Sequence, residues 1–156
     1  MEAEIVPLEH TELAPVTVAP QQNPALVYLA SLSESSRRPM RQSLEVIAEL
    51  ATNGACDAIT MPWWRLRYQH TQALRTELAA RFSPATANRH MSALRGVLKD
   101  AWRLGYLSAE DYQRAVDLKP IKGQKAQQAE KGRHLKPGEM TALLNACMDG
   151  SNAGIR

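Results

Sequence analysis

The strongest constraint on the fold is a repeated start signal for helices, in which a capping residue precedes a proline. The signal occurs at Asn23-Pro24 and at Ser83-Pro84. Proline is favoured at the first helical position because its missing N–H would have no partner there. After these signals, apolar residues recur every three or four positions, as on the buried side of a helix. No segment alternates with the two-residue period of a strand, so the sequence predicts an all-α fold.

We expect a small bundle of four or five helices between residues 24 and 117. The expected helices cover about residues 25–32, 35–51, 62–81, 84–104 and 109–116. The second helix accommodates Pro39 only if that residue falls in its first turn. Trp63 and Trp64 open the third helix and are expected to anchor its packing. The fourth helix has the clearest apolar stripe, formed by Ala87, Met91, Leu94, Leu98 and Ala101 with Trp102.

The segments on either side of this bundle differ from it in composition. Residues 1–23 contain four Glu, three Pro and no Lys or Arg, which predicts a flexible, disordered acidic arm. Residues 118–135 are rich in Lys and Gln and nearly free of apolar residues, which predicts a basic linker. Residues 136–156 start another helix, from Glu139 to about Cys147. We expect them to begin a second, truncated catalytic domain.

Several function classes find no support in the sequence. No run reaches the roughly 18 apolar residues of a membrane span, and the amino terminus lacks a secretory signal pattern, so we expect a cytoplasmic protein. Cys56 and Cys147 stand alone, without the spacing of a metal site. No metalloprotease, hydrolase or phosphate-loop motif occurs. We therefore expect no catalytic residue, metal, cofactor, small-molecule substrate or membrane partner for this chain.

The basic residues are more informative than the net charge of +3. Arginines gather at the start of the second helix, and hydroxyl, amide and arginine side chains alternate along the start of the fourth. Such side chains suit phosphate oxygens and base edges in the major groove. A solvated face with ordinary capping residues explains the same spacing equally well. The residues concerned are Arg37, Arg38 and Arg41 in the second helix, and Thr86, Asn88, Arg89, Ser92, Arg95 and Lys99 in the fourth.

Three segments in this order resemble the amino-terminal, core-binding half of tyrosine recombinases, the phage integrase and Xer-like group. They read SLSESSRRPMRQSLEVIAELA, SPATANRHMSALRGVLKDAWRLGYLS and HLKPGEMTALLNAC. The resemblance extends over about residues 24–150 and is strongest at 83–107. Each segment alone is weakly diagnostic, whereas the three in order at these separations are fairly specific.

The resemblance implies a SAM-like helical domain that clamps the double-stranded DNA of a recombination site. The DNA contacts would come from the basic and polar residues of the second and fourth helices, and linker lysines would follow the phosphate backbone. The first and fifth helices would contact neighbouring protomers of a tetramer on DNA. The linker residues among the contacts are Lys119, Lys122 and Lys125.

The same resemblance assigns the chemistry elsewhere. In this family a tyrosine cleaves one DNA strand without a metal or nucleotide cofactor, and its catalytic residues belong to the carboxy-terminal domain. The Gly-Leu-Arg box that carries the first catalytic arginine does not occur in this chain. The part at hand would then supply recognition and assembly for DNA integration by a mobile genetic element, and no catalysis.

Two other functions remain open at this stage. The first is a non-enzymatic helical DNA-binding regulator that uses residues 84–103 as its recognition helix, although the sequence shows no tight two-helix turn before that segment. The second is a helical protein-interaction module without a role on DNA. Charge reversal at Arg89 and Arg95 would leave partner binding intact in that second case.

Overall fold

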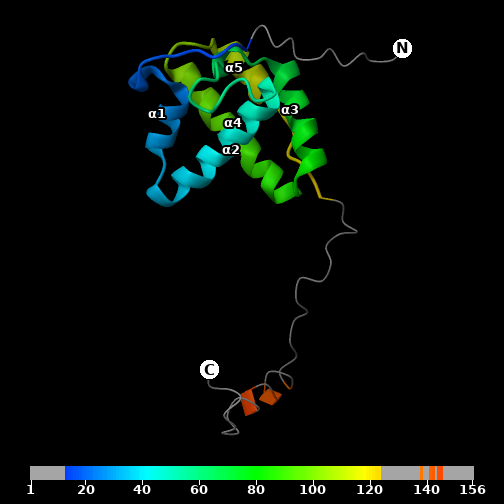
Figure 1. The fold of residues 1–156 in the computed structure, drawn as a ribbon. Helices are drawn as coiled ribbons and strands as arrows, with labels where there is room; N and C mark the ends of the chain where they lie inside the picture. Colours follow the sequence, from blue (N-terminus) through cyan, green and yellow to red (C-terminus); the bar gives the residue numbers. More distant parts are fainter. Residues whose placement is uncertain (1–12, 124–137, 139–140, 143, 146–156) are drawn as a thin grey trace, which may run out of the picture. The chain divides into compact units, whose positions relative to one another are not determined.

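The computed structural model describes residues 13–123, 138, 141–142 and 144–145, and these residues contain helices and no strand (Figure 1). The prediction of an all-α bundle is therefore confirmed for the described part of the chain. Residues 124–156 form a separate unit, of which the few described residues are helical. The helix predicted from Glu139 to Cys147 thus lies mostly outside the described residues.

The elements are η1 (Pro20–Gln22), α1 (Pro24–Ser31), α2 (Glu34–Thr52), η2 (Trp63–Arg65), α3 (Tyr68–Arg81), α4 (Pro84–Arg103) and α5 (Ala109–Val116).

Helix α4 is the centre of the bundle, and α1, α2, α3 and α5 all pack against it (Figure 1). Five residues of its predicted apolar stripe are at most 1% exposed, whereas Trp102, predicted with them, is 38% exposed and lies outside the buried stripe. Helix α1 crosses α4 very closely at Gly96. A Cβ atom at this glycine would lie 2.2 Å from the Tyr28 ring, so only a residue without a side chain fits there.

The predicted starts of α1 and α4 are also confirmed in detail. The Asn23 side chain accepts hydrogen bonds from the backbone N–H groups of Ala25 and Leu26, and so caps α1. The Ser83 hydroxyl accepts from the N–H of Thr86 at the start of α4. At the other end of α4, Gly105 has a φ of 88°, which suits glycine and ends the helix.

Helix α2 begins earlier than predicted, at Glu34 rather than at Ser35 or Ser36. Pro39 is consequently its sixth residue and lies in the second turn, outside the first turn that the sequence analysis required. The proline leaves the carbonyl of Ser35 without its usual N–H partner. Because Ser35 is exposed, water can occupy that position.

The third predicted helix divides into two elements. Trp63 to Arg65 form the short η2, and α3 starts at Tyr68 instead of Pro62. Trp63 is fully buried, and its indole N–H donates to the carbonyl of Ala58 at 3.0 Å. Its predicted role as a packing anchor is therefore confirmed, and this anchoring holds η2 as a separate turn before α3.

Both predicted boundaries of the bundle were placed too far inward. Leu13 is 2% exposed, and the N–H of Val16 donates to the carbonyl of Thr60 at 2.8 Å. Residues 13–23 therefore pack on the bundle, and only residues 1–12 of the predicted arm lie outside the described residues. At the other end, Leu118 and Ile121 are 8% and 9% exposed. The folded unit consequently extends through Gly123, and the rest of the predicted linker, residues 124–135, lies outside the described residues.

Candidate nucleic-acid interface

Asn88 of α4, a predicted DNA contact, binds the backbone of residue 121 instead. Its amide nitrogen donates to the carbonyl of Ile121 at 2.8 Å, and its amide oxygen accepts from the N–H of the same residue at 2.9 Å. The pair of bonds imitates the pairing of two strands and engages both the nitrogen and the oxygen of the side-chain amide. While these bonds exist, Asn88 cannot turn this edge of its amide toward a base.

Two arginines hold the preceding residues of the same segment. The Arg95 guanidinium donates to the carbonyl of Leu118 at 2.8 Å. Arg75 of α3 donates to the carbonyls of Lys119 and Pro120 at 2.7 and 3.2 Å. Residues 117–123, which we call the fastened segment, thus run along α3 and α4. A Cβ at Gly123 would lie 3.3 Å from Pro84, so the segment ends beside the start of α4.

The two hydroxyl residues predicted as DNA contacts have local partners. The Thr86 hydroxyl oxygen accepts from the Ser83 hydroxyl at 3.1 Å, within the cap of α4. The Ser92 hydroxyl donates to the carbonyl of Asn88 one turn earlier in the same helix, at 3.0 Å. Both bonds are exposed and can be exchanged for a ligand.

Four cations remain on the solvent side of α4 and the fastened segment. Arg89, Lys99, Lys119 and Lys122 are exposed and make no hydrogen bond or ion pair through their side chains within the described residues. Arg89 and Lys99 lie ten residues apart on one helix, which corresponds to about 15 Å. We call these four residues the α4 basic face. Lys125, the remaining predicted linker contact, lies outside the described residues.

Negative charge is nearly absent from α4. The helix contains one carboxylate, Asp100, which is 6% exposed and accepts from Arg103 at 3.3 Å. More broadly, residues 13–123 contain 14 Lys and Arg against nine Asp and Glu. The α4 basic face therefore presents positive charge to solvent without a carboxylate from its own helix.

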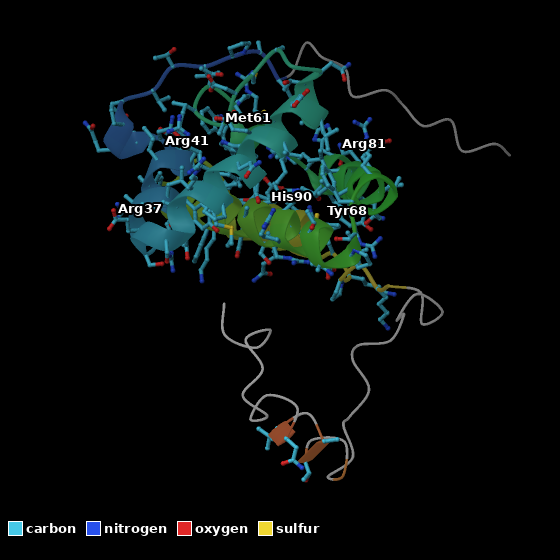
Figure 2. The ribbon with its side chains drawn as sticks, turned by 60° about the horizontal axis from the view of Figure 1, so that its bottom comes forward. Arg37, Arg41, Met61, Tyr68, Arg81 and His90 are labelled. Carbon is cyan, nitrogen blue, oxygen red and sulfur yellow. The ribbon has the colours of Figure 1, made fainter. Side chains whose placement is uncertain are left out.

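The arginines at the start of α2 have a different setting. The Arg37 guanidinium donates to the carbonyls of Leu32 and Ala30 at 3.1 and 3.3 Å, and so covers the end of α1. Arg38 is exposed. Figure 2 shows Arg37 and Arg41 at one end of the molecule, away from Tyr68 and Arg81. These arginines surround an apolar groove between α1 and α2.

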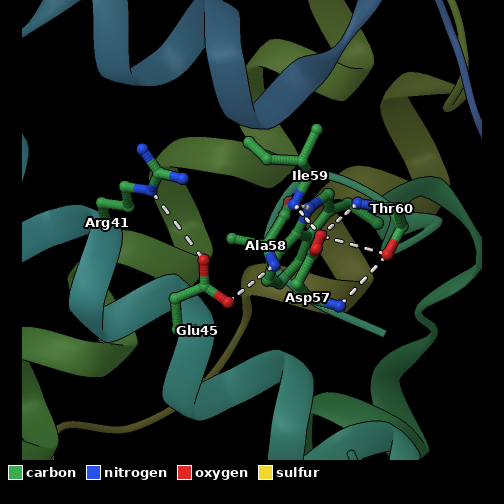
Figure 3. Close-up of polar contacts among 7 residues, drawn as sticks. Arg41, Glu45, Asp57, Ala58, Ile59 and Thr60 are labelled. Atoms are coloured by element: carbon green, nitrogen blue, oxygen red, sulfur yellow. Dashed lines mark hydrogen bonds and ion pairs between the residues drawn. The ribbon is translucent and has the colours of Figure 1, made fainter. Parts of the chain in front are cut away.

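Arg41 also belongs to a polar network that shapes the loop after α2 (Figure 3). Its Nε lies 3.9 Å from Oε1 of Glu45, and the other carboxylate oxygen accepts from the N–H of Ala58 at 3.1 Å. In the same loop, Asp57 accepts from the backbone N–H groups of Thr60 and Ile59. The bond from the Thr60 backbone, above all, lowers the pKa of Asp57, and the Arg41 charge adds to this effect.

His90 lies within the polar-looking start of α4 but is 2% exposed. Its ring packs edge-on against Phe82, with the ring centroids 4.8 Å apart. Burial lowers its pKa, and the neighbouring Arg89 charge lowers it further. The sequence signal for this burial is its place beside Ala87 and Met91 on the apolar stripe, so His90 is a core residue and not a surface ligand.

Other kinds of site find no support in the described part of the chain. No group of three or more His, Cys, Asp or Glu side chains there is placed to hold a metal ion. Among the described helices, none combines the length and apolar character needed to cross a membrane. None of the protein-family models, curated proteins and solved structures compared with this chain matches it.

Proposed function

We propose that residues 13–123 bind the phosphate backbone of double-stranded DNA through the α4 basic face. The observation that carries this proposal is the placement of Arg89, Lys99, Lys119 and Lys122, whose side chains are exposed and have no anionic partner among the described residues. Exposed Lys and Arg side chains gathered on one surface are the electrostatic footprint of a nucleic-acid partner.

The dimensions of the face suit a duplex. The 15 Å or so between Arg89 and Lys99 corresponds to about four base pairs along the duplex axis, at about 3.4 Å per base pair. The fastened segment adds Lys119 and Lys122 beside this helix, and its hydrogen bonds to Asn88 and Arg95 fix where the backbone of these lysines lies. Two rows of charge from two chain segments can then follow one groove edge.

The resemblance of residues 83–107 to tyrosine recombinases supports a more specific context. In that context the bundle is the core-binding half of a site-specific recombinase, holds the recombination site and helps assemble a tetramer. Strand cleavage by a tyrosine would belong to a catalytic domain, and this part of the protein would contribute grip and position.

The test is fluorescence anisotropy of the 156-residue chain with a labelled duplex over 50–200 mM salt. If each of the four cations neutralises one phosphate, the logarithm of affinity falls with the logarithm of salt at a slope of about −3.6. The double variant Arg89→Gln/Lys99→Gln should make that slope shallower by about 2.

The matched control is Arg81→Gln/Arg114→Gln, which removes the same charge from exposed ion pairs on α3 and α5. Apart from the effect of its lower net charge, this control should bind DNA like the unmodified chain. Equal losses in both variants would show that only the total charge matters and would contradict the proposed face. Absence of binding at 50 mM salt would favour a protein-interaction module instead.

A further inference from the structure

The groove between α1 and α2 is lined by two kinds of side chain that the proposed DNA contact does not use. Its volume is about 480 Å³, and it is open to solvent. Apolar residues of α1 form one wall and arginines of α2 form the other, and no carboxylate among the described residues lines it. The lining residues are Leu26, Leu29, Ala30, Arg37, Arg38 and Arg41. A ligand with both apolar and anionic groups therefore matches this groove.

The positive charge of the arginine wall is only partly neutralised. Arg37 donates to two carbonyls at the end of α1, which are uncharged partners and leave its charge in place. Arg38 makes no hydrogen bond or ion pair among the described residues. Arg41 pairs with Glu45, with 3.9 Å between its Nε and the carboxylate oxygen Oε1. Three arginines with one carboxylate partner between them attract an anionic ligand.

The apolar wall distinguishes this groove from the α4 basic face. Leu26, Leu29 and Ala30 are three and four residues apart, so they lie on one side of α1. Leu26 is half-buried and Ala30 is exposed. The phosphate backbone of DNA would pair with the arginines but leave this wall in contact with water. Because removing apolar surface from water is favourable, a partner with apolar side chains of its own fits the groove better than DNA does.

The two walls offer side chains, and hardly any backbone groups, to a partner. Their residues belong to helices, whose peptide groups bond within each helix. Arg37 already occupies the carbonyls of Ala30 and Leu32. An extended peptide would therefore leave its own N–H and C=O groups unpaired, whereas a helix pairs them internally. Sites for small molecules enclose most of their ligand, so an open groove fits a segment of a larger partner better.

We infer that the groove between α1 and α2 binds an acidic amphipathic helix of a partner protein. Apolar side chains three or four residues apart on that helix would cover the apolar wall. Its Glu or Asp side chains would pair with Arg38 and Arg41. Arg37 can join through the N–H groups that its two bonds to α1 leave over, since a guanidinium has five. This contact uses no residue of the α4 basic face and does not depend on the proposed DNA binding.

A synthetic helix tests this assignment on the 156-residue chain. The probe is a fluorescein-labelled peptide of about 15 residues, with leucines three and four residues apart, glutamates beside them and alanines elsewhere. We expect saturable binding by fluorescence anisotropy. In the ¹⁵N-enriched chain, the unlabelled peptide should shift the amide signals of residues 26–30 and 37–41. Absence of binding up to about 1 mM protein, or shifts confined to the α4 basic face, would overturn the inference.

The charge pairing is tested with variants of equal charge. Arg38→Gln/Arg41→Gln should weaken binding of the peptide about tenfold, because two exposed charge pairs are lost. The matched control is again Arg81→Gln/Arg114→Gln, which removes the same charge from exposed ion pairs elsewhere. The control should bind the peptide nearly as well as the unmodified chain. Equal losses in the two variants would contradict the pairing at the groove.

Three further samples examine other occupants. A peptide of the same composition, in an order that gives no apolar side, should bind about tenfold more weakly. Equal binding of this peptide would show that charge alone acts. Displacement of the first peptide by duplex DNA, with shifts at the same groove amides, would assign the groove to DNA. Shifts at these amides that depend on protein concentration without any peptide would assign it to a second copy. Each of these three results would overturn the inference.

Discussion

The start of α2 and the outer side of α4 are alike in sequence, since both combine arginines with polar residues near the beginning of a helix. In the structure they differ in what they touch. Three polar side chains of α4 and α3, Asn88, Arg95 and Arg75, are bonded to the backbone of the fastened segment. The α2 arginines instead border an open apolar groove.

The difference shows that a polar residue on a helix has to be interpreted together with the backbone that passes over it. A chain segment without helical bonds needs partners for its N–H and C=O groups when it is buried. Leu118 and Ile121 bury the fastened segment against the bundle, so that α3 and α4 must supply such partners. At the start of α2, Arg37 binds only the carbonyls at the end of α1 and Arg41 pairs with Glu45 of its own helix. Arg38 makes no hydrogen bond or ion pair among the described residues and remains available to a ligand.

The largest expected effect comes from Asn88→Ala. The change leaves the N–H and C=O of Ile121, a 9% exposed residue, without their partners. We expect a loss of about 2 kcal/mol in the free energy of unfolding, measured by urea denaturation. Ser92→Ala, one turn along the same helix, is the matched control and should cost less than 0.5 kcal/mol. Equal effects would mean that the two bonds between Asn88 and Ile121 contribute no more to stability than the bond of Ser92.

A pH titration examines the buried side of α4. Burial holds the pKa of His90 below its ordinary value of about 6.5. Below pH 6.5 the unfolded chain therefore takes up a proton that the folded chain resists. The free energy of unfolding should be fully present above pH 6.5 and fall on acidification, by at most about 1.4 kcal/mol per pH unit. His90→Leu should make the free energy of unfolding depend less on pH between pH 7.5 and 5.5. An unchanged dependence on pH in this variant would contradict the role of His90.

The smallest effect is expected at the start of α2. Arg38→Ala removes an exposed side chain with no hydrogen bond or ion pair among the described residues, so the free energy of unfolding should change by less than 0.5 kcal/mol. Arg95→Ala breaks the bond to the carbonyl of Leu118 and should cost about 1 kcal/mol. Thermal denaturation of the two variants should show the larger loss of stability for Arg95→Ala. A larger loss for Arg38→Ala would contradict this prediction.

The helices could be predicted from the sequence because their signals are local. Asn23, Ser83 and Ser108 cap within three residues, and the apolar stripe of α4 follows the helical period. The start of α3 could not be predicted, because Trp63 is held by Ala58 in a preceding loop. Likewise, Leu118 and Ile121 belong to the predicted linker, since two apolar side chains among lysines give no periodic signal.

The candidate site was predicted in part. The assignment of DNA contacts to α4 stays a prediction, and Arg89, Lys99, Lys119 and Lys122 are exposed as a nucleic-acid contact requires. Asn88 and Arg95 were chosen for the same reasons, yet their partners lie 33 and 23 residues away in the chain. Such long-range bonds cannot be detected from local sequence spacing. The sequence therefore could not distinguish the residues that bind the fastened segment from those that stay exposed to a ligand.

The central claim is that the two basic regions have different roles, with DNA bound at the α4 basic face and not at the start of α2. The most direct test compares the salt dependence of DNA binding for Arg89→Gln/Lys99→Gln and for Arg38→Gln/Arg41→Gln, two variants with the same loss of charge. We predict a slope shallower by about 2 for the first and an unchanged slope for the second. A shallower slope for the second variant, with the first unchanged, would contradict the account.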